Sequence, residues 1–463
     1  MEDKTMKKVF GIAALLLALA ACNKETEITP VEQPSDSKGI TITATLAPKT
    51  ADTKAVADKG DNKITVTWAK NEHIAILYDK DGAQVADATI TAVDGTTGAA
   101  TIEFSVVSGT ADNTACTLVY PAKLSDGTTT VYNDEKTGVK DAATLLAAQD
   151  GTLNANLDVR VGAGTIRTTT PSLTVTTQPE AQFAIFKFTL SGPSIDATHP
   201  LVIKDNASNK TITTVTPAST ATSVFVAMPA AASKAYKFVV TTADNKYIKS
   251  GTATIAAGNY YQTTLTMSPR YPLALSSATA DDLGAVVNSK GQMSVEKAAA
   301  SGTAVGIVGK VTETGHGLIL ALKDATAQTW DTIKDWTPTT KFAGGTTLKV
   351  LPDDAARGAN LTDYIWLGGV LDHILVSNWC VAQKSDYEEI FTNLGSTTGD
   401  FRGKTYDTNV NAYITTGVGG TALDGNYWSA TEYGGRYAWG FYRYSWINYF
   451  TTGSDSVRPV LAF

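Results

Sequence analysis

Short runs of apolar and polar residues in alternation dominate the chain from residue 39 to about residue 268. The run Ile40–Leu46 alternates at nearly every position, and a period of two places successive side chains on opposite faces of a β-strand. Further strands are predicted at Ile64–Trp68, Glu72–Tyr78, Thr101–Val107, Cys116–Tyr120, Phe183–Leu190, Thr211–Thr216, Ser223–Met228, Tyr236–Thr241 and Tyr260–Met267. One segment is predicted to be helical instead: Lys140–Asp150 is a candidate short helix in a connection between strands. Strands at this density predict β-sandwiches.

The tetrapeptide Asp79–Gly82 follows one of these strands and has the composition of a hairpin turn. Its Asp-x-Asp-Gly pattern also resembles part of a calcium-binding loop. However, the acidic residue that an EF-hand places last is missing, and the glycine is in the wrong position. The sequence therefore predicts a plain turn and no metal site here.

Two changes in composition divide the chain. A Gly- and Thr-rich break at residues 160–170 predicts a boundary between a first sandwich at 40–164 and a second at 165–268. Pro269 and Pro272 then form a stiff junction. Because domain boundaries normally fall in segments that few contacts cross, we expect few contacts across this junction.

Residues 271–463 mix strands with helices and are predicted to form an α+β domain. The best helical candidates are Glu296–Ala300 and Asp386–Leu394. The second has Ser385 as a candidate N-cap and Glu388 three residues later, as in a capping box.

The charge balance and the cysteine count exclude several classes of function. The 463 residues carry 38 Lys and Arg against 45 Asp and Glu, a net charge of −7 with no basic block, which excludes nucleic acid as a natural partner. The 3 Cys and 4 His have no zinc-site spacing. His316, alone between two glycines, is more typical of a structural hydrogen-bonding residue than of a ligand. We expect no metal and no cofactor.

The first 22 residues have the pattern of an export signal. Two lysines precede the apolar run Val9–Ala21, whose 13 residues are fewer than the ~20 of a transmembrane helix. The run ends in Leu, two Ala and Cys22, which resembles the lipobox of bacterial lipoproteins. Residues 1–21 are therefore predicted to be a signal peptide, Cys22 the site of lipidation, and 22–39 a flexible tether.

The segment Asn23–Glu27 combines one lysine with two glutamates. This resembles the signal that sends lipoproteins of Bacteroidetes to the outside of the outer membrane. The resemblance implies a protein that is lipid-anchored in the outer membrane and faces the cell exterior.

The last 37 residues, Tyr427–Phe463, contain 12 of the 39 aromatic residues of the chain. The rings alternate with Gly, Arg, Ser and Asn. This combination is typical of antibody paratopes, where amphipathic rings supply contact area at low entropic cost. An aromatic-lined edge of a β-sheet would have the same composition, so composition alone leaves both interpretations open.

Four segments between residues 40 and 268 resemble motifs of one known family: Trp68, Asn71–Ile74, Val119–Ala122 and Ala257–Tyr261. Together they resemble the fimbrillin-like lipoproteins of Bacteroidetes over about residues 40–268. The resemblance implies two tandem β-sandwiches and other fimbrial subunits as partners. Stalk subunits of that family are cut after an Arg in the first strand, whereas here no Arg precedes Arg160. This departure argues against a polymerising stalk role.

The order of five segments favours the paratope interpretation of the aromatic end: Gly315–Leu318, Asn378–Ala382, Tyr427–Tyr433, Ala438–Trp439 and Val457–Phe463. This frame resembles the C-type-lectin-fold domains of variable proteins that diversity-generating retroelements rewrite. The resemblance covers about residues 271–463. It implies that surface positions within about 433–456 are diversified while the framework is kept.

Carried over position by position, the resemblance assigns two sets of residues. Five match the framework and should be structural: Trp428, Glu432, Trp439, Arg458 and Pro459. Twelve fall where variable, ligand-contacting side chains lie: Tyr433, Gly434, Gly435, Arg436, Tyr437, Gly440, Tyr442, Tyr444, Ser445, Trp446, Asn448 and Tyr449. The register from Arg443 to Thr452 stays open, because the glycine expected in that hairpin is absent and Trp446 is a candidate for its place.

The predicted fold is thus mainly β, with two tandem fimbrillin-like β-sandwiches followed by an α+β C-type-lectin-like domain. The predicted function is that of a surface-anchored adhesin whose head binds a protein or glycan on another cell, a phage or a host surface. The alternative is a structural fimbrial subunit at a tip.

Two further functions of this fold are not expected. Formylglycine-generating enzymes resemble it but need redox-active cysteines, whereas the head of this chain has only Cys380, so we expect no enzyme. The Glu-Pro-Asn and Gln-Pro-Asp triplets of calcium-dependent lectins are absent from the sequence.

Overall fold

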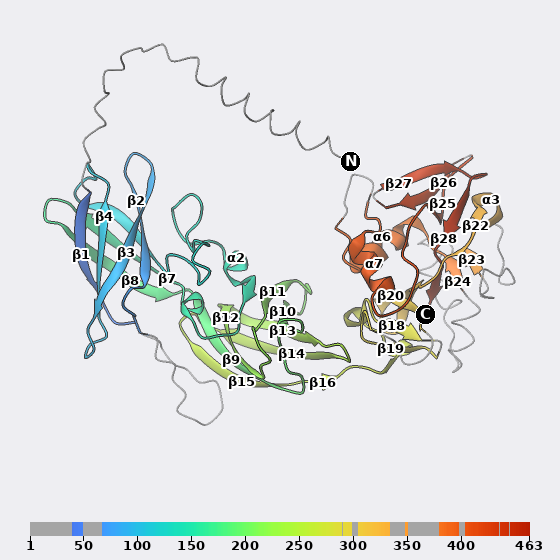
Figure 1. Cartoon of the computed structure of the whole chain (residues 1–463), viewed down its shortest axis with the longest axis horizontal. Helices are drawn as coiled ribbons and strands as arrows, with labels where there is room; N and C mark the ends of the chain where they lie inside the picture. Colours follow the sequence, from blue (N-terminus) through green and yellow to red (C-terminus); the bar gives the residue numbers. More distant parts are fainter. Residues whose placement is uncertain are drawn as a thin grey trace, which may run out of the picture.

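The computed structural model describes residues 39–49, 67–288, 290–298, 304–333, 348–350, 379–397, 403–434, 436–443 and 445–463. These residues are mainly β-strands, as predicted, and the strands of the first sheet, the sandwich and the C-terminal sheets follow one another along the longest axis (Figure 1). The predicted signal peptide, Cys22 and the tether up to residue 38 lie outside the described residues. Within the described part, no helix is long and apolar enough to cross a membrane.

The first sheet has seven strands in the order β1-β4-β3-β2-β5-β7-β8. Their bounds are β1 Ile40–Leu46, β2 His73–Asp79, β3 Ala83–Val93, β4 Ala100–Val106, β5 Thr114–Tyr120, β7 Arg160–Arg167 and β8 Ser172–Ala181. The sheet curls until its two edge strands, β1 and β8, come together. The backbone N of Ala47, the residue after β1, donates to Oε1 of Gln178 on β8 at 3.1 Å. The first core is therefore enclosed by one curled sheet, and it includes Ile42, Ile76 and Phe104.

The predicted hairpin turn joins β2 to β3. Asp79 pairs with Ala83, and Asp81 and Gly82 have φ values of 56° and 118°. Both residue types tolerate this left-handed region better than most others do. Of the predicted strand Ile64–Trp68, only Thr67 and Trp68 are described, and neither belongs to a strand.

The predicted boundary between residues 164 and 165 falls inside β7, which pairs with both β5 and β8. The glycines of this segment allow close packing rather than mark a linker. A Cβ on Gly162 would lie 2.8 Å from the carbonyl oxygen of Thr177, and one on Gly164 would lie 3.0 Å from that of Thr174. The first sheet therefore continues to Ala181.

Two sheets face each other around the second core, with strand orders β16-β14-β13-β10-β11-β6 and β12-β9-β15. The bounds are β6 Ala148–Gln149, β9 Phe183–Ser191, β10 Leu201–Asp205, β11 Thr211–Val215, β12 Ser223–Pro229, β13 Ala231–Thr241, β14 Lys246–Ile255, β15 Tyr260–Thr266 and β16 Ser268–Pro269. Both sheets contribute to the core, for example Phe188 from one and Phe238 from the other, whose ring centroids lie 5.2 Å apart. This part is a β-sandwich.

The short strand β6 links the first sheet to the sandwich. It lies in the connection between β5 and β7, yet it pairs in parallel with β11. The side chain of Gln149 accepts from Ala227 N at 2.8 Å and donates to Ala227 O at 3.0 Å. The same connection holds the predicted short helix, α2 (Ala142–Leu146), with Asp141 as its N-cap, and the 3-10 helix Ala155–Leu157. The first sheet and the sandwich are thus interlocked.

The C-terminal part has an eight-stranded sheet, β17-β19-β18-β20-β21-β29-β24-β23, and a five-stranded sheet, β22-β28-β25-β26-β27. The strands are β17 Leu273–Ala274, β18 Val286–Asn288, β19 Gln292–Ser294, β20 Ala304–Glu313, β21 His316–Ala321, β22 Ala325–Thr329, β23 Leu348–Val350, β24 Trp379–Val381, β25 Tyr427–Gly434, β26 Tyr437–Tyr442, β27 Ser445–Phe450, β28 Ser454–Val457 and β29 Val460–Ala462. The helices are α3 Trp330–Ile333, α6 Lys384–Asn393 and α7 Thr408–Thr415, with 3-10 helices at Leu275–Ser277 and Ala280–Asp282.

The eight-stranded sheet lies between two apolar clusters. Ile319 and Leu461 face one cluster, which they share with Trp428 of the five-stranded sheet. Leu320 and Val460 face the other, which α6 and α7 cover. Successive residues of one strand therefore enter different cores, which explains the nearly continuous apolar pattern of β21 and β29.

Two helix predictions need correction. Glu296–Ala298 form a turn with Lys297 at φ 58°, so the described part of the predicted helix Glu296–Ala300 is not helical. The helix α6 exists, but its N-cap is Gln383, whose capping box uses Asp386, and not Ser385 with Glu388.

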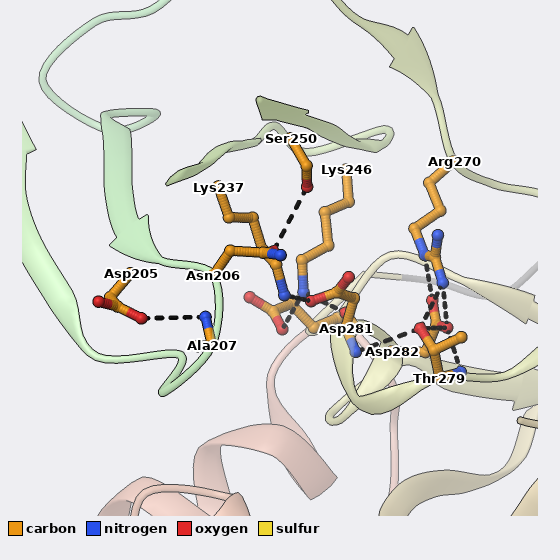
Figure 2. A network of polar contacts seen from close by, with 11 residues as sticks. Asp205, Asn206, Ala207, Lys237, Lys246, Ser250, Arg270, Thr279, Asp281 and Asp282 are labelled. Atoms are coloured by element: carbon orange, nitrogen blue, oxygen red, sulfur yellow. Dashed lines mark hydrogen bonds and ion pairs between the residues drawn. The ribbon is translucent and has the colours of Figure 1, made fainter. Parts of the chain in front are cut away.

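Polar contacts cross the predicted junction, which contradicts the expectation of few contacts there. Figure 2 shows Lys237 and Lys246 of the sandwich reaching Asp281. Nζ of Lys237 donates to Oδ1 of Asp281 at 2.6 Å, and Nζ of Lys246 donates to the backbone oxygen of Asp281 at 2.7 Å. Arg270 holds the fully buried carboxylate of Asp282 through two hydrogen bonds of 2.5 Å. Prolines fix the backbone of a junction but do not prevent long side chains on flanking strands from spanning it.

Candidate binding site

Strands β25, β26 and β27 form an antiparallel group that presents two different faces. In the register of β26 with β27, Tyr437 pairs with Phe450, Trp439 with Asn448 and Phe441 with Trp446. Side chains of directly opposite residues lie on the same face, so these pairs share one face and the alternate pairs share the other.

The inner half of the first face is core. Phe441 and Trp446 are fully buried, with ring centroids 5.2 Å apart. Phe441 also lies 4.9 Å from Tyr387 and 5.2 Å from Phe391, both on α6. Helix α6 therefore seals this half of the face from water.

The outer half of the same face reaches solvent, and we call it the aromatic face. It consists of Tyr433, Tyr437, Trp439 and Phe450. Tyr433 and Phe450 are 54% and 57% exposed. The ring of Tyr433 meets that of Trp439 edge-on at 5.0 Å, and the rings of Tyr437 and Phe450 lie 4.7 Å apart. The four rings therefore pack against one another in two pairs.

The first residue of α6 borders the aromatic face. Nζ of Lys384 lies 5.3 Å from the ring centroid of Trp439 and 4.9 Å from that of Trp446, distances typical of cation–π contacts. Lys384 also forms an ion pair with Glu388. Its backbone N donates to Oγ1 of Thr431 at 2.8 Å, which ties α6 to β25. A fixed positive charge thus lies beside the exposed rings.

The opposite face of β26 and β27 has a structural role near its centre. The ring of Tyr449 packs on Trp428 with centroids 5.8 Å apart, and burial raises the pKa of Tyr449. A Cβ on Gly440 would lie 2.9 Å from the carbonyl oxygen of Tyr427 and 3.1 Å from the Tyr449 ring. Glycine is therefore required where Tyr449 crosses β26.

The twelve predicted ligand-contacting residues separate into several groups. On the aromatic face or at its edge lie Tyr433, Tyr437 and Asn448. Exposed near the connection from β25 to β26 are Gly434 and Arg436. On the opposite face lie Gly440, Tyr442, Ser445 and Tyr449. Outside the described residues lie Gly435 and Tyr444.

Two of these twelve are placed in the interior. Trp446 is fully buried, and its Nε1 donates to the backbone oxygen of Lys404 at 3.2 Å. Gly440 is also buried. Neither residue reaches the surface in this structure, because the alternation of β26 and β27 turns both positions toward packed side chains.

The five predicted framework residues also differ among themselves. Trp428, Arg458 and Pro459 are buried. Nε of Arg458 lies 2.7 Å from Oδ1 of Asp324, and burial raises the pKa of that carboxyl even though Arg458 opposes the shift. Trp439 is only partly buried and belongs to the aromatic face, while Glu432 is exposed.

Sequence reasoning missed Phe450 and Lys384 as members of this region. The alternation of side chains along β26 and β27 places Phe450 on the same face as Tyr437, but this follows only once the pairing register of the two strands is known. Lys384 is distant in sequence, and no local pattern points to it.

His316, predicted to be structural, has Nε2 3.6 Å from Oε1 of Glu313.

Comparisons with known proteins assign no family. No protein-family description matches the chain, and no curated protein matches it. Among solved structures, a fimbrial protein of Bacteroides ovatus is similar at 12% identity and a TM-score of 0.24, over 92% of this chain and 99% of that one.

Two further solved structures are similar over half of the chain. For a fimbrial assembly protein of Parabacteroides distasonis, the identity is 16% and the TM-score 0.28, with 49% of this chain and 90% of that one covered. For the minor pilin of Streptococcus agalactiae, the identity is 10% and the TM-score 0.20, with 50% of this chain and 99% of that one covered. TM-scores of this size place the chain in no fold family.

Proposed function

We propose that the chain is a cell-surface adhesin that binds a protein or a glycan of another surface through the aromatic face. The observation that carries the proposal is a cluster of four rings, in which Tyr433 and Phe450 are exposed and Tyr437 and Trp439 are partly exposed. Contiguous exposed apolar surface is uncommon unless a partner covers it, and aromatic side chains supply much of the energy of binding hot spots.

The rings stand on a β-sheet beside a sealed core. Phe441 and Trp446 pack next to them on the same face of β26 and β27, so the sheet that carries the rings is anchored to the core without help from a ligand. A preorganised surface loses little conformational entropy on binding, which favours affinity. The exposed rings can also change identity without loss of the core, and this supports a diversified surface within about 433–456.

The proposal includes the arrangement around this site. A lipid at Cys22 would anchor the chain in the outer membrane, residues 22–39 would form the tether, and the two β-rich units would act as a spacer. Residues 271–463 would form the C-type-lectin-like binding head. The two β-rich units and the C-terminal part follow one another along the longest axis, which suits a spacer (Figure 1). The same order would also suit a fimbrial tip subunit, the second candidate. No catalytic role or cofactor is proposed.

The experiment compares exposed aromatic residues on opposite faces of the same strands. Wild-type protein is first screened on glycan and protein arrays to obtain a ligand. The double variant Tyr433→Ser/Phe450→Ser is then compared with Tyr442→Ser, whose ring is 43% exposed on the opposite face. The proposal requires loss of binding in the first variant only. Equal binding by wild type and the double variant, at equal melting temperature, would refute it.

The proposed diversification has a separate test at the DNA level. A near-copy of the codons for about 433–456 beside a reverse transcriptase gene would support it. Adenine positions of that copy should coincide with codons for exposed residues such as Tyr433. A genome with no such copy would remove this part of the proposal and leave the binding face intact.

A further inference from the structure

A lysine is enclosed in the first sheet close to a carboxylate. Lys49 follows β1, and its side chain is 1% exposed. Its Nζ lies 3.0 Å from Oδ2 of Asp158, whose side chain is 6% exposed. Nζ also lies 3.7 Å from the ring centroid of Tyr120 and 4.4 Å from that of Trp68. Two aromatic rings therefore keep water away from the pair.

A second carboxylate and an arginine complete the cluster. Oε2 of Glu72 lies 4.0 Å from Nζ of Lys49. Glu72 is fixed by the hydroxyl of Tyr120, which donates to Oε1 at 2.7 Å, and by Ala69 N, which donates to Oε2 at 2.8 Å. Nε of Arg160 donates to Oδ1 of Asp158 at 2.8 Å. Oδ2 of Asp158 faces Nζ of Lys49, and within the described residues it accepts no further hydrogen bond.

Burial disfavours the charged form of this lysine. Burial lowers the pKa of Lys49, although the charges of Asp158 and Glu72 act in the opposite direction. A buried ion pair is costly because both ions lose their hydration, and the neutral amine is the nucleophilic form of lysine. Conversion of the pair into a neutral amide would remove that cost.

We propose that Nζ of Lys49 and Cγ of Asp158 form an intramolecular isopeptide bond. One hydrogen of the Lys49 ammonium passes to Oδ2, and the lone pair left on Nζ attacks Cγ. A second hydrogen passes from nitrogen to Oδ2 through Glu72. The bond from Cγ to Oδ2 then breaks, Oδ2 leaves as water, and the third hydrogen stays on the amide nitrogen. The step consumes no oxidant and no further reactant.

The surrounding residues fit this step. Arg160 holds Oδ1, the oxygen that becomes the amide oxygen, and its positive charge would stabilise the negative charge that develops there. Oδ2, the oxygen that leaves, contacts Nζ of Lys49 and accepts no further hydrogen bond in the described part of the chain. The bond would join the end of β1 to the residues that lead into β7, and so would fasten the first strand covalently to its own sheet.

Peptide mass spectrometry of the folded full chain tests the proposal. Trypsin should not cut after Lys49, and the digest should contain peptide 39–54 joined to peptide 141–160, lighter than their sum by one water. Lys234 and Asp205 are the matched control, because their Nζ to Oδ2 distance is also 3.0 Å but both side chains are partly exposed. No linked peptide is expected for that pair. Cleavage after Lys49, with both peptides recovered free, would overturn the proposal.

Two variants assign the roles. Asp158→Ala should restore cleavage after Lys49. Glu72→Gln keeps the size of the side chain and should leave most of the protein unlinked if Glu72 carries the proton. Full linkage in the Glu72→Gln variant would overturn that role, and the result for wild-type protein decides the bond itself whether or not a variant folds.

Discussion

The ring of Trp446 packs against the ring of Phe441, its cross-strand partner, with centroids 5.2 Å apart and planes at 66°. Both side chains are fully buried. Two positions further along β26, Trp439 lies on the same face but reaches solvent. The boundary between core and candidate binding surface therefore runs across a single face of the sheet, between Phe441 and Trp439.

Trp446→Ala should destabilise the C-terminal part severely. Replacement of a fully buried Trp by Ala costs ~3 to 5 kcal/mol, because it removes transfer free energy and leaves a cavity. Trp439→Ala should cost less, since that ring is partly exposed. Urea unfolding followed by tryptophan fluorescence and circular dichroism would compare the two. A larger loss for Trp439→Ala would reverse the assignment of core and surface.

Gly440→Ala should also destabilise the protein, although it adds only a methyl group. The new Cβ would lie 2.9 Å from the carbonyl oxygen of Tyr427, and such overpacking costs ~1 to 3 kcal/mol. Gly251→Ala is the control, because nothing lies within 4 Å of its Cβ position. Melting temperatures by calorimetry check the pair, and equal melting of both variants would contradict the packing of Tyr449 over Gly440.

Substitution of serine for Tyr433 or Phe450 should leave stability nearly unchanged. Both rings are more than half exposed, and surface changes usually stay within about ±0.5 kcal/mol. Thermal unfolding of the single variants measures this directly. If either variant melts as low as Trp446→Ala, its ring is part of the core and cannot act as a free contact surface.

Acidification should weaken the contacts at the junction. Burial alone would raise the pKa of Asp282, but hydrogen bonds from Arg270 and Thr279 outweigh it and hold the pKa below its usual value. The unfolded chain has an Asp pKa of about 3.9, so this stabilisation is complete above that pH and is lost as the pH falls through the lower folded pKa.

Asp282→Asn should therefore be less stable than wild type at neutral pH, and the difference should shrink in strong acid. Asp81→Asn is the control, because that carboxylate is exposed in a turn and Asn tolerates its positive φ. Denaturant unfolding at a series of pH values gives the comparison. A difference that is constant with pH would show that the charge of Asp282 is not what stabilises the junction.

The proposed lipid anchor can be tested in cells. Cys22→Ala should release the protein from the membrane fraction, because acyl chains supply ~0.8 kcal/mol per buried methylene and the variant would carry none. Protease treatment of intact cells should degrade the wild-type protein if it faces outward. Unchanged membrane association of the variant, or full protection of wild type, would contradict the anchor or its orientation.

The alternation of apolar and polar residues correctly predicted strands such as Ile40–Leu46 and Phe183–Leu190, because a half-buried strand needs one apolar face wherever it lies in the fold. It did not predict β7, whose glycines were interpreted as a linker. Those glycines are required by close approach of a neighbouring backbone, which is a property of the pair of strands and not of either sequence alone.

Local sequence determined strands such as β1 and β9, the hairpin turn at Asp79–Gly82, the helix α6 and the concentration of aromatic residues at the end of the chain. The fold alone decided which of those rings are buried. Tyr437, Trp439 and Phe441 alternate identically along β26, yet only Phe441 lies under α6. Burial depends on what packs against a position. The neighbours of Trp446 include Lys384 and Lys404, which are distant from it in the sequence.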